Sequence, residues 1–236
     1  MSRFAYHIPI LGYHRVGDWR ADHVPTVSAA AFKTQLNFLS RHRYRVLSLA
    51  DVVTFLERGE PIPRHSAVIT FDDGYEETYQ IAWPMLKAAG FPAAIFVTPT
   101  EVGLPGFVKW DQLAEMVKDG MAVGSHTMRH SYLPLVKSDR LDEEVIESKR
   151  IIEEHIGYPV QFFSYPVGGF SQEIQSVIKG AGYLAACTTN RAIAQHKMDR
   201  YALRRIKVTE HDAFPILFWV KLSGYYDLFR QLETPN

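Results

Sequence analysis

The sequence predicts one α/β domain folded as a barrel or a distorted barrel. Strand-like and helix-like segments alternate along the chain, which is typical of parallel strands joined by crossover helices. About seven strands in a single domain favour a closed barrel over the alternative, an open doubly wound sheet. No linker rich in Pro, Gly or Ser divides the 236 residues. We therefore expect residues 1–236 to form one domain, with 209–236 as a C-terminal helical and aromatic extension.

Apolar and β-branched runs predict the strands, and amphipathic runs of helical periodicity predict the helices. In chain order the expected elements of the first half are strand 8–14, helix 28–42, strand 44–48, helix 49–59, strand 67–73, helix 78–90, strand 93–99 and helix 110–120. Those of the second half are strand 121–126, helix 139–157, strand 161–166, helix 171–182, strand 183–189 and strand 201–208. Glycines stand where helices should stop, at positions 59, 90, 120, 157 and 182, because glycine accepts the left-handed conformation found there.

Composition excludes several classes of protein. Hydrophobic residues make up 47% of the chain and charged residues 22%, as in a soluble domain with a substantial core. The net charge is zero, so no electrostatic footprint for nucleic acid or for an anionic membrane is present. Cys187 is the single cysteine, which excludes a disulfide framework, and its apolar strand predicts an inert core thiol. The N-terminus lacks a signal-peptide pattern and its apolar run is too short to span a bilayer, so we expect a cytoplasmic protein.

Three polar clusters fall at the ends of expected strands. Asp72 and Asp73 end one strand, His126 ends another and begins the spacing to His130, and His14 ends the first. The carboxyl ends of parallel strands in an α/β barrel meet on one face, so these side chains should lie together. Alone, the aspartates suit a turn, the paired histidines a chance spacing, and His14 a hydrogen-bonded core position. Their joint placement favours a functional site.

The ligand types in these clusters predict a metal site. Asp73, His126 and His130 form a set of two imidazoles and one carboxylate, which suits Zn²⁺ or another divalent first-row metal. Because adjacent residues at the end of a strand point in different directions, Asp72 can stay free of the ion and act as a base. Because a bound metal lowers the pKa of water toward about 7, a neighbouring carboxylate can take its proton at neutral pH. The pattern predicts hydrolytic attack on a carbonyl group.

Three motifs carry a resemblance to a known family. The stretches ITFDDGY (69–75), GSHTMRH (124–130) and FSYPVGGF (163–170) resemble the first three motifs of the polysaccharide deacetylases, carbohydrate esterase family four, or NodB-homology domain. ILGYHRV (10–16) resembles the start of bacterial members of the exopolysaccharide deacetylase branch, and the likeness covers residues 8–208. It implies a distorted (β/α)7 barrel that hydrolyses an N-acetyl group from an amino sugar and releases acetate. The implied substrate is a polysaccharide, a lipid-linked glycan or a smaller glycoside.

The resemblance also implies roles for single residues. Asp72 would be the general base, and Asp73, His126 and His130 would hold the metal. The third motif would form one wall of the substrate groove through Tyr165 and Pro166, and the backbone N–H of Val167 would act as the oxyanion donor.

Two departures from the family pattern affect the proton-transfer groups. Ser164 stands where the third motif has an arginine that orients the base, and Arg205 is expected to replace it, or Arg204 if the strand register shifts by one. The fifth motif of the family offers a histidine as general acid, which LRRIKV (203–208) lacks. His14 is the preferred candidate for this role, and His211 is the alternative.

Two further segments have structural interpretations. The aromatic stretch 213–229 is expected to form a helix that covers the barrel, with peripheral membrane contact as the alternative. The helix 139–157 is expected to be a solvated outer helix without a chemical role. Two rival functions stay open: hydrolysis of a non-sugar C–N bond, as in a cyclic ureide or imide, and a catalytically silent carbohydrate-binding barrel.

Overall fold

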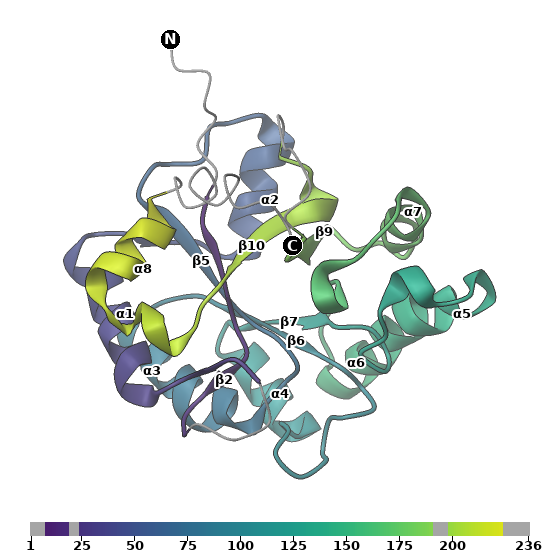
Figure 1. Ribbon diagram of the computed structural model, residues 1–236. Coiled ribbons are helices and arrows are strands. Elements are labelled where there is room, and N and C mark those ends of the chain that lie inside the picture. Colours follow the sequence, from purple (N-terminus) through teal and green to yellow (C-terminus); the bar gives the residue numbers. More distant parts are fainter. Residues whose placement is uncertain (1–7, 19–23, 191–197, 224–236) are drawn as a thin grey trace, which may run out of the picture.

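Seven parallel strands form a closed ring in the computed structural model, which describes residues 8–18, 24–190 and 198–223 (Figure 1). The ring closes because β1 pairs with β10 on one side and with β5 on the other. Its strands, in order around the ring, are β1 (Ile10–Tyr13), β5 (Ser66–Phe71), β6 (Ala94–Val97), β7 (Ala122–Ser125), β8 (Phe162–Ser164), β9 (Ala185–Thr188) and β10 (Leu203–Lys207). The predicted distorted (β/α)7 barrel is confirmed, and closure excludes the open sheet.

Helices surround this ring (Figure 1). The α-helices are α1 (Ala29–Arg41), α2 (Leu49–Arg58), α3 (Trp83–Ala89), α4 (Trp110–Lys118), α5 (Ser138–Asp142), α6 (Ser148–Ile156), α7 (Gln172–Gly180) and α8 (Pro215–Leu222). A π-helical segment, η1 (Thr78–Ala82), leads into α3, and a second, η3 (Glu143–Glu147), joins α5 to α6. Single 3₁₀ turns are η2 (Leu133–Leu135), η4 (Pro166–Gly168), η5 (Arg200–Ala202) and η6 (Glu210–Ala213).

The expected strand 44–48 does not belong to the ring. It is the two-residue strand β4 (Arg45–Val46), which pairs with the first two residues of β5. Another short parallel pair, β2 (Arg15–Val16) with β3 (Thr26–Val27), has no counterpart in the sequence prediction. The β2–β3 pair is too short to show the alternating pattern from which strands are predicted.

Strand residues alternate between two hydrophobic cores, as the pleat of a β-strand requires. In β5, Val68 faces the inside of the barrel, whereas Ile69 and Phe71 face the surrounding helices. The inner core also contains Ile10, Ala94, Phe96, Phe162, Ala185, Cys187 and Leu203. Side chains of α2 pack against this inner cluster and close the amino-terminal end of the barrel. The carboxyl end is therefore the end available for a site.

Gly124 leaves space for a large side chain inside the barrel. A Cβ atom at this position would lie 2.5 Å from Cδ1 of Phe96 and 2.7 Å from the carbonyl oxygen of Phe162. Both distances are shorter than real Cβ contacts, so β7 accepts only glycine here unless the ring of Phe96 moves.

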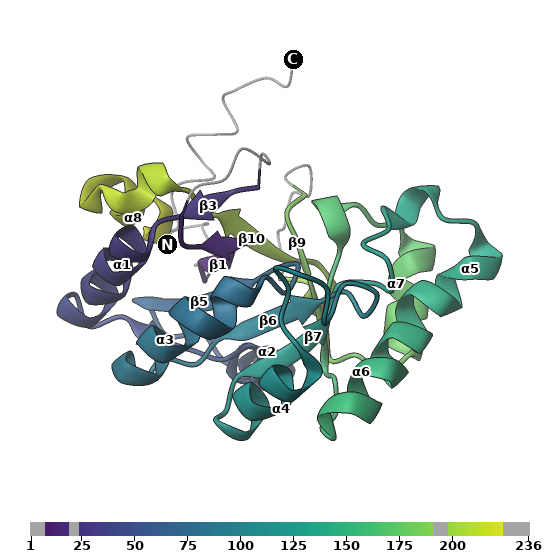
Figure 2. The same ribbon diagram turned by 90° about the horizontal axis from the view of Figure 1, so that it is seen from below.

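The C-terminal extension packs against α1 through η6 and α8, and α8 lies beside α1 in both views (Figures 1 and 2). Phe218 is buried and meets the ring of Phe38 edge to face at 5.7 Å. The opposite surface of α8 exposes four large apolar side chains, Phe214, Ile216, Leu217 and Trp219. Residues 224–229 of the stretch discussed above lie outside the described residues. Among the described residues, no helix is both long and apolar enough to cross a membrane.

Candidate active site

The polar side chains at the carboxyl end of the barrel continue the inward alternation of its strands. Asp72 comes four residues after Val68, and Arg205 comes two residues after Leu203; both reference residues belong to the inner core. His14 and His126 likewise come directly after β1 and β7. The inward-facing positions, which recur at every second residue of a strand, therefore continue from the inner core into the site.

Asp72 is buried and held by an arginine from β10. Nη1 of Arg205 donates to Oδ1 of Asp72 at 2.7 Å, and Nη2 donates to Oδ2 at 2.6 Å. The same guanidinium donates to the hydroxyls of Thr70 (3.2 Å) and Ser164 (2.9 Å). Such a two-pronged contact fixes the carboxylate in one orientation. The half-buried neighbour Arg204 takes no part in this contact.

The charge of Arg205 keeps Asp72 ionised. Burial by itself would raise the pKa of this carboxyl group, but the Arg205 guanidinium, His126 and the hydrogen bonds from Arg205 outweigh it and hold the pKa well below its usual range. Asp72 therefore carries its negative charge at neutral pH.

Asp73 comes from the loop after β5, and His126 and His130 come from the loop after β7. Oδ1 of Asp73 lies 3.5 Å from Nε2 of His126 and 3.3 Å from Nε2 of His130. The ligand atoms of the three residues all lie within 4.8 Å of one another. His126 is almost fully buried, whereas His130 is exposed to solvent. One ion can thus be reached by all three ligands while one side stays open.

The hydrogen bonding of His126 suits a cation at this point. Its Nδ1 lies 2.7 Å from the carbonyl oxygen of Ser164, which can only accept, so Nδ1 carries the proton and Nε2 has a free lone pair. That lone pair faces Oδ1 of Asp73, a buried oxygen with no hydrogen-bond donor in the described part of the chain. Two acceptors facing each other need a positive charge between them, and a backbone carbonyl behind a ligating imidazole is the usual support of a metal ligand.

The pKa shifts of the two imidazoles differ in direction. Burial lowers the pKa of His126, so its ring is neutral at pH 7, as a metal ligand must be. The carboxylate of Asp73 raises the pKa of the more exposed His130.

Unusual backbone conformations are concentrated in the site. Six described non-glycine residues have positive φ, and four of them lie here: Asp73 (70°), Thr127 (67°), His130 (55°) and Val167 (58°). Each such residue costs on the order of 1–3 kcal/mol, and the cost is highest for a β-branched residue such as Val167. Strain concentrated at ligands and loop residues indicates a geometry kept for function.

His14 lies beside the two aspartates. Its Nδ1 is buried and has no hydrogen-bond partner among the described residues. Burial lowers the pKa of this imidazole, and the charges of Asp72 and Asp73 partly oppose the shift. His211, the alternative general acid, is exposed on η6, which packs against α1. His14 is therefore the candidate that faces the aspartates.

The third motif divides between the core and the surface. The side chain of Tyr165 is 1% exposed, and its hydroxyl donates to the carbonyl oxygen of Tyr201 at 2.9 Å, so it supports the loop from inside. Pro166 is buried, and Val167 is 75% exposed. Only Val167, of these three, offers both backbone and side chain at the surface.

Sequence reasoning missed several residues around the site. Thr70 and Ser164, which contact Arg205, could have been found by extending the inward alternation of their strands. Glu101 follows β6, and burial and then the charge of Asp73 raise its pKa. Glu144 contacts the loop of His130 from the helix 139–157, which was expected to have no chemical role. No local sequence signal identifies Glu101 or Glu144, because their proximity depends on tertiary structure.

Comparisons with known sequences agree with this geometry. The family model described as polysaccharide deacetylase matches residues 59–186. The chain is 29% identical over 202 residues to YxkH of Bacillus subtilis (strain 168), a match that covers 86% of this chain and 71% of the relative. It is 26% identical over 216 residues to the poly-beta-1,6-N-acetyl-D-glucosamine N-deacetylase of Staphylococcus aureus (strain MRSA252), with 86% and 73% covered.

Solved structures share the barrel. IcaB from Ammonifex degensii is similar with a TM-score of 0.78 and 26% identity, and the match covers 91% of this chain and 97% of that one. The Streptococcus pyogenes deacetylase PplD, solved in complex with acetate, gives a TM-score of 0.80 at 24% identity, with 96% and 98% covered. The second similarity extends the agreement in fold to nearly the whole of both chains.

Proposed function

The chain belongs to the polysaccharide deacetylase family, and from this membership and the site geometry we propose that it is a metal-dependent N-deacetylase of acetylated amino sugars. One observation supports this most strongly. Three ligand atoms of Asp73, His126 and His130 converge next to Asp72, a buried carboxylate that Arg205 keeps ionised and oriented. Such an arrangement suits hydrolysis of an amide bond by an activated water.

Each residue has a defined task in the proposed reaction. A divalent cation on Asp73, His126 and His130, with Zn²⁺ as our choice, would polarise the acetyl carbonyl and acidify water. Asp72 accepts the proton of the attacking water. His14 donates a proton to the nitrogen of the departing amine, and the N–H of Val167 donates a hydrogen bond to the oxygen on which negative charge develops.

The substrate class is proposed from the relatives together with the open side of the site. The Staphylococcus aureus relative is named for poly-beta-1,6-N-acetyl-D-glucosamine. In this chain the exposed His130 and Val167 lie at the rim, so an acetamido group can reach the ligands while the sugar stays outside the barrel. We therefore propose N-acetylglucosamine in a β-1,6-linked glycan as the first substrate to test.

Acetate release tests the proposal. The purified chain is incubated with a β-1,6-linked N-acetylglucosamine oligomer, and acetate and free amine are measured. We expect release in equal amounts, loss of activity with a chelator and recovery with Zn²⁺. A cyclic ureide or imide in place of the oligomer tests the rival hydrolase, since turnover of that compound without acetate release would favour it.

The variant Asp72→Asn separates an enzyme from a silent binding barrel. The amide keeps the shape of the side chain but cannot take a proton at neutral pH. We expect turnover to fall by about 10²–10⁴-fold, the usual contribution of a general base. Unchanged turnover would contradict the assigned role of Asp72, and oligomer binding without turnover in both proteins would favour the silent barrel.

A further inference from the structure

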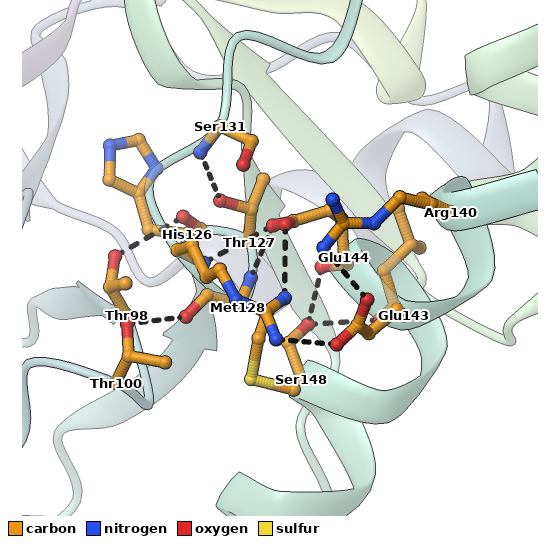
Figure 3. Close-up of polar contacts among 12 residues, drawn as sticks. Thr98, Thr100, His126, Thr127, Met128, Ser131, Arg140, Glu143, Glu144 and Ser148 are labelled. Atoms are coloured by element: carbon orange, nitrogen blue, oxygen red, sulfur yellow. Dashed lines mark hydrogen bonds and ion pairs between the residues drawn. The ribbon is translucent and has the colours of Figure 1, made fainter. Parts of the chain in front are cut away.

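The loop of residues 126–131, here called the ligand loop, carries both histidines of the proposed metal site. One side of it is attached to the chain that follows β6 (Figure 3). Oγ1 of Thr98 donates to the carbonyl oxygen of His126 at 3.3 Å. Thr100 donates to the carbonyl oxygen of Met128 through its hydroxyl at 2.9 Å and its N–H at 3.3 Å. These contacts use carbonyl groups of the loop.

Two N–H groups of the ligand loop point the other way, to a single buried carboxylate. Oε2 of Glu144 accepts the N–H of Met128 at 3.0 Å and that of Arg129 at 3.2 Å (Figure 3). These two consecutive donors stand between the left-handed residues Thr127 and His130. Successive N–H groups in such a turn form a concave anion-binding nest. Glu144, which is 3% exposed, fills it.

Glu144 is itself fixed relative to β7. It lies in the π-helical segment η3, where its carbonyl oxygen accepts the hydroxyl of Ser148 at 2.8 Å. The same hydroxyl lies 2.8 Å from that of Ser125, the residue directly before His126. Through Ser148, the helical segment that carries Glu144 is therefore connected to β7, the strand that leads into the ligand loop. π-Helical segments of this kind occur frequently at functional sites.

We propose that Glu144 is a positioning residue of the metal site: by occupying the nest, its carboxylate fixes the strained backbone that aims His130 at the ion. Its contacts lie with the two residues before His130 and with the side chain of Arg129, so it acts through His130. This inference rests on the proposed metal-dependent function. Supports behind metal ligands typically alter metal affinity by about 10–100-fold.

Zn²⁺ affinity of the metal-free protein, measured by competition with a chromophoric chelator, tests this role. We expect Glu144→Ala to weaken Zn²⁺ binding by about 10–100-fold. Glu144→Gln should stay within about threefold of the wild type, because its amide oxygen still accepts both N–H groups. Glu143→Gln is the matched control: Glu143 also contacts Arg129, but its side chain is 40% exposed and the residue is only half-buried, so Zn²⁺ affinity should not change.

The outcomes separate this inference from the proposed function. A wild type that binds no Zn²⁺ overturns both, whereas a binding wild type with unchanged affinity in Glu144→Ala overturns only the role of Glu144. Equal loss in the Ala and Gln variants would also contradict it, since the backbone contacts would then not be the cause. Should Glu144→Ala fail to fold, amide exchange of the wild type decides: fast exchange at Met128 and Arg129 would rule out the nest.

Discussion

Asp72 combines full ionisation with low basicity. The guanidinium of Arg205 holds its pKa well below the usual range, which makes the carboxylate available at all relevant pH values but a weak proton acceptor. Such a base works only if the water it deprotonates is unusually acidic. The cation proposed on Asp73, His126 and His130 meets this requirement, so the two halves of the site depend on each other.

Replacing Arg205 should move the acid side of the pH–rate profile. In Arg205→Met burial is no longer opposed by the guanidinium, so the pKa of Asp72 rises and the carboxylate becomes protonated at a higher pH. We expect the acid limb of kcat/KM to shift upward and the protein to lose about 3–5 kcal/mol of stability at pH 7, since a buried charge is left unpaired. Measurements of kcat/KM against pH and urea unfolding check both effects.

Arg204→Met is the matched control for this prediction, because the neighbouring arginine does not hold Asp72. Its acid limb should coincide with that of the wild type. An unchanged acid limb in Arg205→Met would show that the guanidinium does not set the ionisation of Asp72.

Cys187 should resist thiol reagents in the native protein. Its side chain faces the inner core, and burial raises the pKa of its thiol to about 12. The thiolate is therefore scarce at pH 8, and the sulfur is also inaccessible. We expect no labelling by a disulfide reagent over hours in buffer and complete labelling in urea. Rapid labelling of folded protein would contradict the burial of this strand.

At the residue level, a side chain of the site can be predicted from the sequence when its chemical type and its position at the end of a strand both indicate a function. Asp72, Asp73, His126 and His130 are recognisable because acidic and imidazole groups gathered together at strand ends favour a functional site. Glu144 carries no such signal, and Ser164 carries only the inward alternation of its strand. A serine and a surface-like glutamate acquire their roles only through the residues that folding places beside them.

At the element level, β7 depends on one glycine. Gly124→Ala forces a methyl group against the ring of Phe96, and such overpacking costs about 1–3 kcal/mol. We expect a loss of stability of this size in urea unfolding. Gly180→Ala is the matched control: a Cβ at the end of α7 meets nothing within 4 Å, so the change should be neutral or stabilise by up to about 1 kcal/mol. Equal stability of the two variants would contradict the packing of Phe96.

Secondary structure followed the sequence where periodicity was strong. All seven ring strands and the main helices were predicted, because their apolar patterns extend over several residues. The π-helical segments were not, since one extra residue per turn shifts the apolar face without interrupting it. Residues 44–48 were predicted as a full strand because their apolar side chains suit a strand, but only Arg45 and Val46 pair with β5.

At the level of the whole molecule, metal binding should stabilise the fold. The ligands come from loops after β5 and β7, and the unfolded chain does not bring them together. Zn²⁺ at 100 times its dissociation constant should raise the free energy of unfolding by about 2.7 kcal/mol. Urea unfolding with and without Zn²⁺ measures the gain, and His130→Ala is the control in which it should shrink. No difference in the wild type would contradict the site.

The closed barrel could be predicted from the alternation of strands and helices together with their number. Closure itself could not be located from the sequence, because the β1–β5 pairing joins strands that are separated by β4 along the chain. β10 and β1 are also far apart along the chain, so the sequence alone did not decide whether Arg205 or Arg204 reaches Asp72. Only the register of β10 against β1 decides which of the two faces the interior.

β10 follows the other six ring strands in chain order, which has a consequence for biosynthesis. This strand seals the ring against β1 and also delivers the partner of Asp72. While residues 203–207 remain inside the ribosome, the emerging polypeptide has neither a sealed barrel nor a neutralised aspartate. The ring can then close, and the site proposed for hydrolysis can be completed, only when this seventh ring strand is free to dock.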